Sequence, residues 1–254
     1  MYQEHDAPAR YSGSVHEWRV LKFDERESDS PVVERVWTAR SERAGMFSSI
    51  AASHWEMVVT RHRGRTSLTV RGPETKATRA ECPAGGEWVA IRFKVGTFWP
   101  ECLPATLRDR NDLTLPAAGA RSFWLNGSTW EYPTFDNADT FVDRIVRKGI
   151  VGRDAIVERA LRGEARACSL RSVQRRFRRA TGITHAAYRS IERARAAANL
   201  LRSGVPIVDV AHRTGYFDQA HLTRSLTHLI GQTPADIAEA SLQLSFLYKT
   251  APLP

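Results

Sequence analysis

The stretch that decides the fold is residues 206–234, PIVDVAHRTGYFDQAHLTRSLTHLIGQTP. Pro206 suits the first turn of a helix because its ring fixes φ, and Gly215 allows a sharp turn three residues before Asp218. The Asp218 side chain can accept a hydrogen bond from a free N–H of a second helix, which Gly231 is suited to end. A helix, a glycine turn and a capped helix follow the helix-turn-helix plan, in which the second helix, here called the reader helix, enters the major groove of DNA.

The C-terminal half contains an internal repeat at an offset of 49 residues. Residues 169–184, SLRSVQRRFRRATGIT, align with residues 218–233, DQAHLTRSLTHLIGQT. Each copy begins with a capping residue, Ser169 or Asp218, and reaches a glycine thirteen residues later. Each copy also carries an apolar ridge at helical spacing: Val173, Phe177 and Ala180 in the first, and Leu222, Leu226 and Leu229 in the second. The repeat therefore predicts two helix-turn-helix units.

The stretch from residue 169 to residue 237 resembles the double helix-turn-helix domain of AraC/XylS-type transcriptional regulators. The residues that carry the resemblance are Pro206, Ile207, Val210, Ala211, Gly215, Tyr216, Asp218, Gln219, His221, Leu222 and Arg224, followed by Gly231, Gln232, Thr233 and Pro234. The resemblance implies a sequence-specific DNA-binding transcriptional regulator that reads two successive major grooves. In this family the other segment is usually an effector-binding or dimerisation domain, often a cupin-like β-barrel.

The first unit departs from this pattern just before its reader helix. Residues 164–168 stand between the preceding helix and Ser169, and none of them is the glycine that the second unit has in its turn. The sequence therefore predicts either a longer turn or a distorted first unit.

Residues opposite the apolar ridges are the candidates for DNA contact. Arginine can pair bidentately with guanine and glutamine with adenine, whereas alanine and the threonine methyl group suit the methyl group of thymine. The predicted DNA-binding residues of the second unit are Gln219, Ala220, His221, Thr223 and Arg224. By the resemblance, the matching positions of the first unit are Arg171, Gln174 and Arg175, while Arg176, Arg178 and Arg179 are expected at phosphates. The alternative for each residue is a solvated helix face.

Charge is divided unevenly between the two halves of the chain. Residues 1–134 contain 18 Lys and Arg against 17 Asp and Glu, whereas residues 135–254 contain 19 against 11. Residues 165–195 hold nine arginines and one acid, Glu192. A basic half joined to a neutral half is typical of a nucleic-acid-binding domain attached to another domain. A solvated basic surface is the alternative, because arginine outnumbers lysine 32 to 5 throughout the chain.

The first half has the pattern of short strands. Segments rich in β-branched and aromatic residues alternate with turns, such as residues 71–73 and 125–128, and all seven tryptophans lie in this half. From Asp136 onward the apolar residues recur at helical spacing. We therefore expect an α+β chain: a β-rich sandwich or cupin-like barrel domain at residues 1–134, followed by an all-α double helix-turn-helix domain at residues 135–254.

The first half offers little evidence for a metal site or a catalytic site. His54, Glu56 and His62 are spread over too much of one extended strand to hold a single ion, at about 3.3 Å per residue. Cys82 and Cys102 have no neighbouring arrangement of His and Asp, so a structural role is expected for both. We therefore expect no catalytic residue, no metal and no cofactor.

The sequence thus predicts a transcriptional regulator that binds double-stranded DNA. A small-molecule effector in the first domain, a homodimer, and RNA polymerase as the partner of an activator are left open. The contending class is a small-barrel, cupin-like enzyme fused to a helical domain. No apolar run is long enough to span a membrane and the N-terminus lacks the pattern of a secretory signal, so a cytoplasmic protein is expected.

Overall fold

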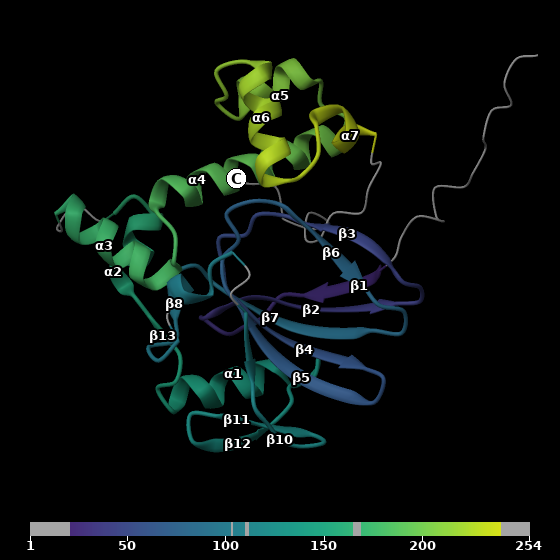
Figure 1. The fold of residues 1–254 in the computed structure, drawn as a ribbon. Helices are drawn as coiled ribbons and strands as arrows, with labels where there is room; N and C mark the ends of the chain where they lie inside the picture. Colours follow the sequence, from purple (N-terminus) through teal and green to yellow (C-terminus); the bar gives the residue numbers. More distant parts are fainter. Residues whose placement is uncertain (1–20, 103, 110–111, 165–168, 240–254) are drawn as a thin grey trace, which may run out of the picture.

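The computed structural model describes residues 21–102, 104–109, 112–164 and 169–239. A strand-rich half, which extends from β1 to β12 and includes helix α1, comes first in the chain (Figure 1). A helical half, α2 to α7, follows it and packs against one end of the strands. This layout confirms the α+β class that the sequence predicted.

In the described part of the chain, the main sheet has six antiparallel strands. In spatial order they are β1 (Leu21–Arg26), β2 (Val33–Ser41), β7 (Glu87–Phe93), β4 (Glu56–His62), β5 (Arg65–Arg71) and β9 (Leu113–Leu115). Successive side chains point to opposite faces, as the pleat requires. Met57 and Ile91 lie in the larger core on one face, whereas Val58 and Ala90 join Trp37 in a smaller core on the other. The main sheet therefore buries apolar side chains on both faces.

Three smaller sheets complete the described strands. They are formed by β10 (Ala117–Gly119), β11 (Ser122–Leu125) and β12 (Ser128–Glu131); by β3 (Gly45–Ser49) and β6 (Thr78–Cys82); and by β8 (Thr97–Phe98) and β13 (Gly152–Arg153). A short 3-10 helix, η1 (Pro104–Leu107), follows β8. Asn126 and Gly127 join β11 to β12 with φ angles of 51° and 70°, the backbone of a tight two-residue hairpin turn.

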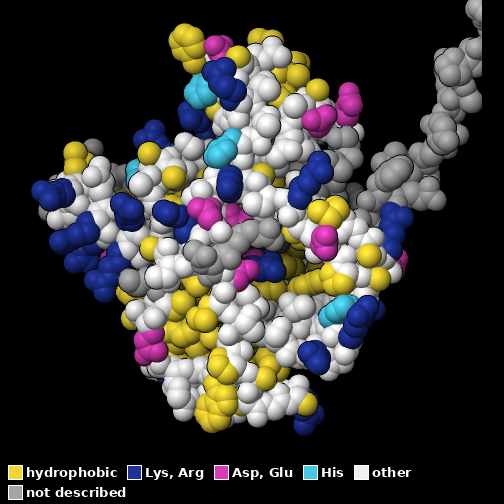
Figure 2. Space-filling view, in the orientation of Figure 1, with side chains coloured by type: hydrophobic (Ala, Val, Ile, Leu, Met, Phe, Trp, Pro, Cys, Tyr) yellow, Lys and Arg dark blue, Asp and Glu magenta, His cyan; other side chains and the backbone are white. Residues whose placement is uncertain are grey.

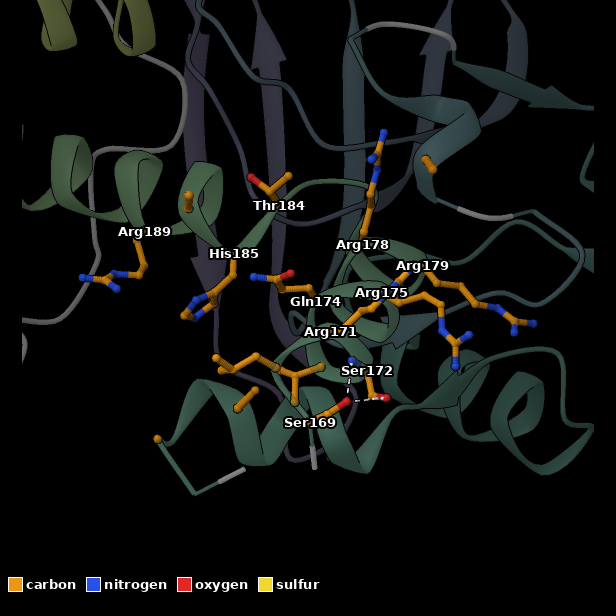
Figure 3. Close-up of a pocket in the computed structure, with 16 residues that line it drawn as sticks. Ser169, Arg171, Ser172, Gln174, Arg175, Arg178, Arg179, Thr184, His185 and Arg189 are labelled. Atoms are coloured by element: carbon orange, nitrogen blue, oxygen red, sulfur yellow. Dashed lines mark hydrogen bonds between the residues drawn. The ribbon is translucent and has the colours of Figure 1, made fainter. Parts of the chain in front are cut away.

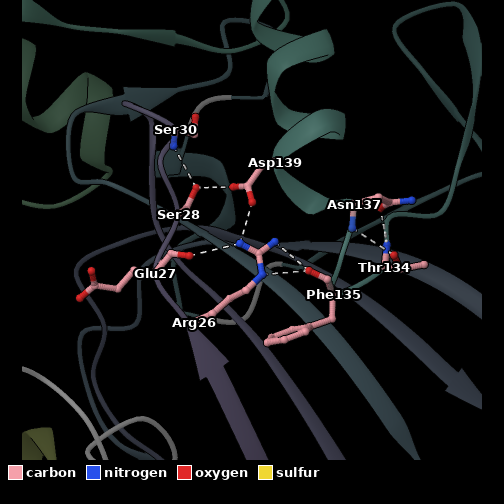
Figure 4. A network of polar contacts seen from close by, with 8 residues as sticks. All are labelled: Arg26, Glu27, Ser28, Ser30, Thr134, Phe135, Asn137 and Asp139. Carbon is pink, nitrogen blue, oxygen red and sulfur yellow. Dashed lines mark hydrogen bonds and ion pairs between the residues drawn. The ribbon is translucent and has the colours of Figure 1, made fainter.

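Helix α1 (Ala138–Arg147) packs against the strands. Its apolar face, which includes Phe141, belongs to the larger core of the main sheet. Arg26 ties the start of the helix to β1, because its guanidinium donates to the Asp139 carboxylate at 2.6 Å and to the Phe135 carbonyl at 2.8 Å (Figure 4). The sequence assigned this helix to the helical domain, whereas its packing partners are strands. The division of the chain after residue 134 stays a prediction.

The helical half is built around one long central helix. Its helices are α2 (Ala155–Leu161), α3 (Leu170–Thr181), α4 (His185–Arg202), α5 (Ile207–Arg213), α6 (Gln219–Leu229) and α7 (Pro234–Ala238). Helix α4 contacts α3, α5, α6 and α7, and it buries Ile191, Ala194 and Ala198 in their common core. None of the described helices combines the length and apolar character that a membrane span requires.

The strand-rich half holds the C-terminal end of α6 by backbone hydrogen bonds. The N–H of Ala51 donates to the Leu229 carbonyl at 2.7 Å, and the N–H of Ala77 donates to the His228 carbonyl at 2.9 Å. The last four carbonyls of a helix have no partner within it, so these bonds satisfy groups that would otherwise need water. The position of α6 is therefore linked to the loops that carry Ala51 and Ala77.

Glycines allow both α3 and α6 to approach the strand-rich half closely. A Cβ atom on Gly182, just after α3, would lie 2.8 Å from the backbone of Pro104 in η1. A Cβ atom on Gly231, just after α6, would lie 3.1 Å from the Ala77 Cβ and from the Ser48 hydroxyl. Equivalent ends of the two reader helices therefore contact the strand-rich half, and Gly182 makes the tighter contact.

Candidate DNA interface

The helical half contains two helix-turn-helix units, α2 with α3 and α5 with α6. Both first helices have seven residues and are followed by a glycine of positive φ, Gly163 (φ 74°) after α2 and Gly215 (φ 71°) after α5. Gly163 lies six residues before the capping residue Ser169, whereas Gly215 lies three residues before Asp218. The predicted absence of a glycine from the first turn is therefore wrong. The glycine is present, and the additional residues follow it, with residues 165–168 outside the described chain.

Equivalent side chains cap the two reader helices, α3 and α6. The Ser169 hydroxyl oxygen accepts a hydrogen bond from the N–H of Ser172 at 3.3 Å, and the Asp218 carboxylate accepts one from the N–H of His221 at 2.6 Å. These bonds satisfy free N–H groups of the first turn and confirm the two predicted capping residues. The predicted apolar ridges face the core, with Val173 partly buried and the others buried: Phe177, Ala180, Leu222, Leu226 and Leu229.

The exposed side of the first unit is a basic concavity of about 1360 Å³. Its walls come from α3, from the first two turns of α4, from Ala105 in η1 and from the end of α2 (Figure 3). The cationic and histidine side chains that line it are Arg171, Arg175, Arg178, Arg179, His185 and Arg189. None of the described residues that line it is Asp or Glu, so the concavity attracts anions.

The structure brings together the residues predicted for DNA contact in the first unit. Four of them are exposed on α3 and line the concavity: Arg171, Gln174, Arg175 and Arg178. Figure 3 shows Gln174 pointing toward His185, whereas Arg175 and Arg179 extend in the opposite direction. The face that the concavity presents therefore combines one amide with several guanidinium groups.

The two other arginines expected at phosphates have different surroundings. Arg179 lines the concavity, whereas the Arg176 guanidinium lies 3.3 Å from the Asp154 carboxylate. Asp154 also caps α2 by accepting a hydrogen bond from the N–H of Ile156 at 2.9 Å. Arg176 therefore contacts its own unit and is not placed with the other arginines of α3.

The second reader helix exposes three of its five predicted residues. These are Gln219, Ala220 and Arg224. His221 is partly buried, and its ring packs edge-on against Tyr216 with 5.1 Å between centroids. Thr223 is also partly buried, and its hydroxyl donates to the Gln219 carbonyl at 2.9 Å. The Thr223 hydroxyl is therefore used within the helix.

Arg175 and Arg224 occupy the same position in the 49-residue repeat. Each lies six residues after its capping residue, and each is exposed. A guanidinium can donate two parallel hydrogen bonds to a guanine edge. Each unit therefore presents one side chain of this kind at the same place on its reader helix.

Positive charge gathers over the first unit. Lys and Arg side chains crowd over α2 and α3 and are sparser over α5 and α6 (Figure 2). Glu192, the one acid of residues 165–195, accepts a hydrogen bond from the Ser53 hydroxyl at 2.7 Å and lies 3.7 Å from the buried Arg195 guanidinium. Glu192 therefore contacts Ser53 of the strand-rich half and Arg195 of its own helix, and not the arginines of the first reader helix.

Two residues of the concavity were missed from the sequence. His185 and Arg189 come from the first turns of α4 and lie four residues apart. Side chains at this spacing share one face of a helix, so the signal was present once the start of α4 was known. The basic concavity of the first unit therefore extends from α3 to the beginning of α4.

The groups considered for metal binding and nucleophilic chemistry, which include His54, Cys82 and Cys102, do not line the basic concavity. Within the described residues, no three His, Cys, Asp or Glu side chains lie close enough to hold a metal ion. Burial, with Arg92 nearby, holds the pKa of the His54 imidazole well below its usual value. Burial raises the pKa of the Cys82 and Cys102 thiols, which disfavours the reactive thiolate. Cys168 lies outside the described residues.

Comparison with known proteins agrees with this geometry. Residues 164–240 match a family model described as a helix-turn-helix domain, of the AraC type. No curated protein and no solved structure matches the chain. The matched segment contains both reader helices, α4 and α7. Residues 164–240 are therefore similar to AraC-type helix-turn-helix domains, which supports a DNA-binding transcription regulator.

Proposed function

We propose that the protein regulates transcription by binding a specific DNA sequence with both helix-turn-helix units, one in each of two successive major grooves. The observation that supports this most is the pair of exposed arginines, Arg175 and Arg224, at equivalent positions of two equally capped helices. Residues near the start of a reader helix contact base edges in helix-turn-helix proteins. Both arginines are suited to base readout for this reason.

The length of α4, which joins the two units, is compatible with both units binding on the same side of a DNA duplex. Helix α4 has 18 residues, which at about 1.5 Å per residue gives a length of about 27 Å. Successive major grooves recur about every 34 Å along one side of the duplex, and both reader helices contact α4. The two reader helices differ in sequence, so one copy of the chain is expected to bind an asymmetric site.

Base contacts and phosphate contacts divide along the exposed faces of the two units. We assign base readout to Arg171, Gln174, Arg175, Gln219, Ala220 and Arg224. We assign phosphate contact to Arg178, Arg179 and Arg189, which widen the basic face around the first reader helix. His221 and Thr223 are assigned weaker roles because both are partly buried.

Selection of bound sites from random duplex DNA, with the full chain, tests the proposal. The expected result is one asymmetric site of about 20 base pairs, protected on one side of the duplex over two turns. Affinity for this site should fall steeply as salt rises, because bound phosphates release counterions. A palindromic site, a one-turn footprint or the enrichment of no sequence would contradict the proposal.

The strand-rich half is proposed to control DNA binding through the ends of the reader helices. It contacts α6 through Ala51 and Ala77 and contacts α4 through the hydrogen bond from Ser53 to Glu192. A ligand with unequal affinity for two arrangements of these loops would shift the reader helices with them. The small-molecule effector, the homodimer and the contact with RNA polymerase stay predictions. Each can be tested once the selected DNA site is known.

Ser53→Ala tests this control without changing a DNA-facing residue. Loss of the bond to Glu192 is expected to change the affinity for the selected site while the chain stays folded. The measurement is a titration of wild type and variant with the same labelled duplex. An unchanged affinity would contradict control through this contact.

A further inference from the structure

Two large apolar side chains are unusually exposed, one in each helix-turn-helix unit. Phe217 is 93% exposed and Leu170 is 82% exposed, more than any other large apolar side chain among the described residues. Leu170 is the first residue of α3, and Phe217 lies two residues before the first residue of α6. Both units therefore present an apolar group where the reader helix begins.

The fold leaves Phe217 no position in the core. A residue just before a capping residue often packs against the fourth residue of the helix, which here is Leu222. Leu222 is buried, and the inner side of the turn is occupied by Tyr216. The Tyr216 ring packs against His221, and its hydroxyl shares a hydrogen bond with Ser225 at 2.9 Å. The chain therefore turns Tyr216 inward and Phe217 outward.

Exposure alone assigns no role, because isolated apolar side chains are common on protein surfaces. The placement is more informative. Phe217 is followed within three residues by Gln219 and Ala220, which are exposed on the second reader helix, and Leu170 lines the basic concavity of the first unit. Both apolar groups thus lie among residues already assigned to DNA.

The major groove offers one apolar group that distinguishes bases, the C5 methyl group of thymine. Aromatic and aliphatic side chains contact this methyl group, while guanidinium and amide groups read the hydrogen-bonding edges of guanine and adenine. A protein partner could also cover an exposed Phe. The recurrence in both units, with Leu170 in the arginine-lined concavity, favours DNA.

We propose that Phe217 and Leu170 are specificity-determining residues that each contact a thymine methyl group in the groove entered by their own unit. The proposal rests on the proposed function, because it assigns a base preference to the same interface. It adds apolar readout to the hydrogen-bonding readout of Arg175 and Arg224.

The test uses the full chain and its selected site, with each thymine replaced in turn by uracil. Uracil keeps the hydrogen-bonding edge of thymine and lacks the methyl group. Wild type is expected to lose about four-fold in affinity at one position under each unit, the effect of one buried methyl-sized group. Phe217→Ala should abolish the difference between thymine and uracil under the second unit and keep it under the first. Leu170→Ala should do the reverse.

Val208→Ala is the matched control, because Val208 is 69% exposed on α5, the helix before the turn. This variant should keep both differences between thymine and uracil. Equal binding of wild type to thymine and uracil duplexes overturns the inference and leaves sequence-specific DNA binding intact. A Phe217→Ala variant that keeps the difference also overturns it.

Two further outcomes distinguish a failure of this inference from a failure of the proposed function. A Phe217→Ala variant that binds DNA as wild type does, but fails to activate RNA polymerase in transcription with purified components, would assign Phe217 to a protein partner and overturn the inference. A selection that enriches no sequence overturns the proposed function itself, and the inference with it.

Discussion

The two helix-turn-helix units have the same scaffold and different exposed faces. In both, a seven-residue helix is followed by a glycine of positive φ, a polar capping residue and a reader helix with a buried ridge. The first reader helix carries five arginines, whereas the second carries one, Arg224. The scaffold depends on a few inward-facing and capping positions, so the outward-facing positions are free to differ between the copies.

This difference indicates different contributions to DNA binding. Phosphate contacts by arginine raise the affinity for every sequence and weaken as salt rises, because each releases counterions. Base contacts distinguish sequences and depend less on charge. The first unit is therefore expected to supply more of the salt-dependent affinity than the second, while both units contribute to the choice of sequence.

The largest expected effect concerns the glycines that let each reader helix approach the strand-rich half. Gly182→Ala should lower the free energy of unfolding by about 3 kcal/mol, since a positive φ costs about 1–2 kcal/mol and overpacking against the Pro104 backbone adds about 1–3 kcal/mol. Gly231→Ala should cost less, because its Cβ would meet the Ala77 side chain at 3.1 Å. Chemical denaturation of the full chain measures both.

Gly204→Ala is the control for these variants. Gly204 has a φ of 81°, and no atom lies within 4 Å of the position its Cβ would take. It should therefore show the backbone cost alone, about 1–2 kcal/mol. Equal losses for Gly182→Ala and Gly204→Ala would mean that the end of α3 is not held against η1.

Arg224→Ala should weaken binding to the selected site by about 1–3 kcal/mol and relax the base preference at one position. The physical reason is the loss of a bidentate contact from the second reader helix. Quantitative binding to a panel of single-base variants of the site measures the preference. Arg175→Ala should relax a different position, about one helical turn of DNA away. Relaxation at the same position would show that the two units do not read separate grooves.

Arg179→Gln should have a smaller effect, a loss of a few-fold in affinity that is the same for specific and random DNA. The slope of log affinity against log salt should fall by about 0.9, as expected for one lost phosphate contact. Arg176→Gln is the matched control on the same helix, because Arg176 contacts Asp154. It should leave the slope unchanged, and an equal change in the two variants would refute the assignment of Arg179 to phosphate.

The smallest expected effect concerns pH-dependent stability and distinguishes α7 from α4, the helices that follow the two reader helices. Thr233 and Asp236 form a capping box at the start of α7, whereas Thr184 at the start of α4 has Ala187 at the matching position. Hydrogen bonds from Thr233 hold the pKa of Asp236 below its ordinary value of 3.8. The carboxylate therefore adds stability above about pH 4, and this stability is lost as the pH falls through the lowered pKa.

Asp236→Ala should remove this part of the pH dependence of the melting temperature between neutral and acidic buffer. Ala187→Asp should introduce a weaker dependence at the start of α4, because it completes the same capping box at a residue that is partly buried against the helical core. If Asp236→Ala keeps the full dependence of wild type, another acid is responsible for it.

Local features of the helical half could be predicted from the sequence because single side chains determine them. Ser169 and Asp218 cap the reader helices as predicted, since an oxygen on a short side chain reaches the free N–H groups beside it. Gly163, by contrast, was missed because the sequences of the two units were compared at one fixed offset. The first helices of the two units align at an offset of 52 residues, three more than the reader helices, so one fixed offset hides the glycine.

Long-range packing could not be predicted in the same way. The apolar face of α1 indicates that Phe141 is buried, but the pattern does not reveal that strands cover it. The contact of Ala51 and Ala77 with α6 uses backbone N–H groups, which every residue except proline possesses. Phe217 is a case in which the residue type predicts the wrong environment. Its apolar side chain favours burial, but the fold exposes it.

The two bonds from the strand-rich half to α6 also report how often α6 separates from that half. The amide hydrogens of Ala51 and Ala77 are held by the last carbonyls of the reader helix, so their exchange with solvent requires α6 to separate from the loops. Their exchange rates measure how often the helix separates, without a label or an engineered probe. An effector or a DNA duplex that loosens or tightens the docking would change both rates together, while amides in the centre of the main sheet would keep theirs.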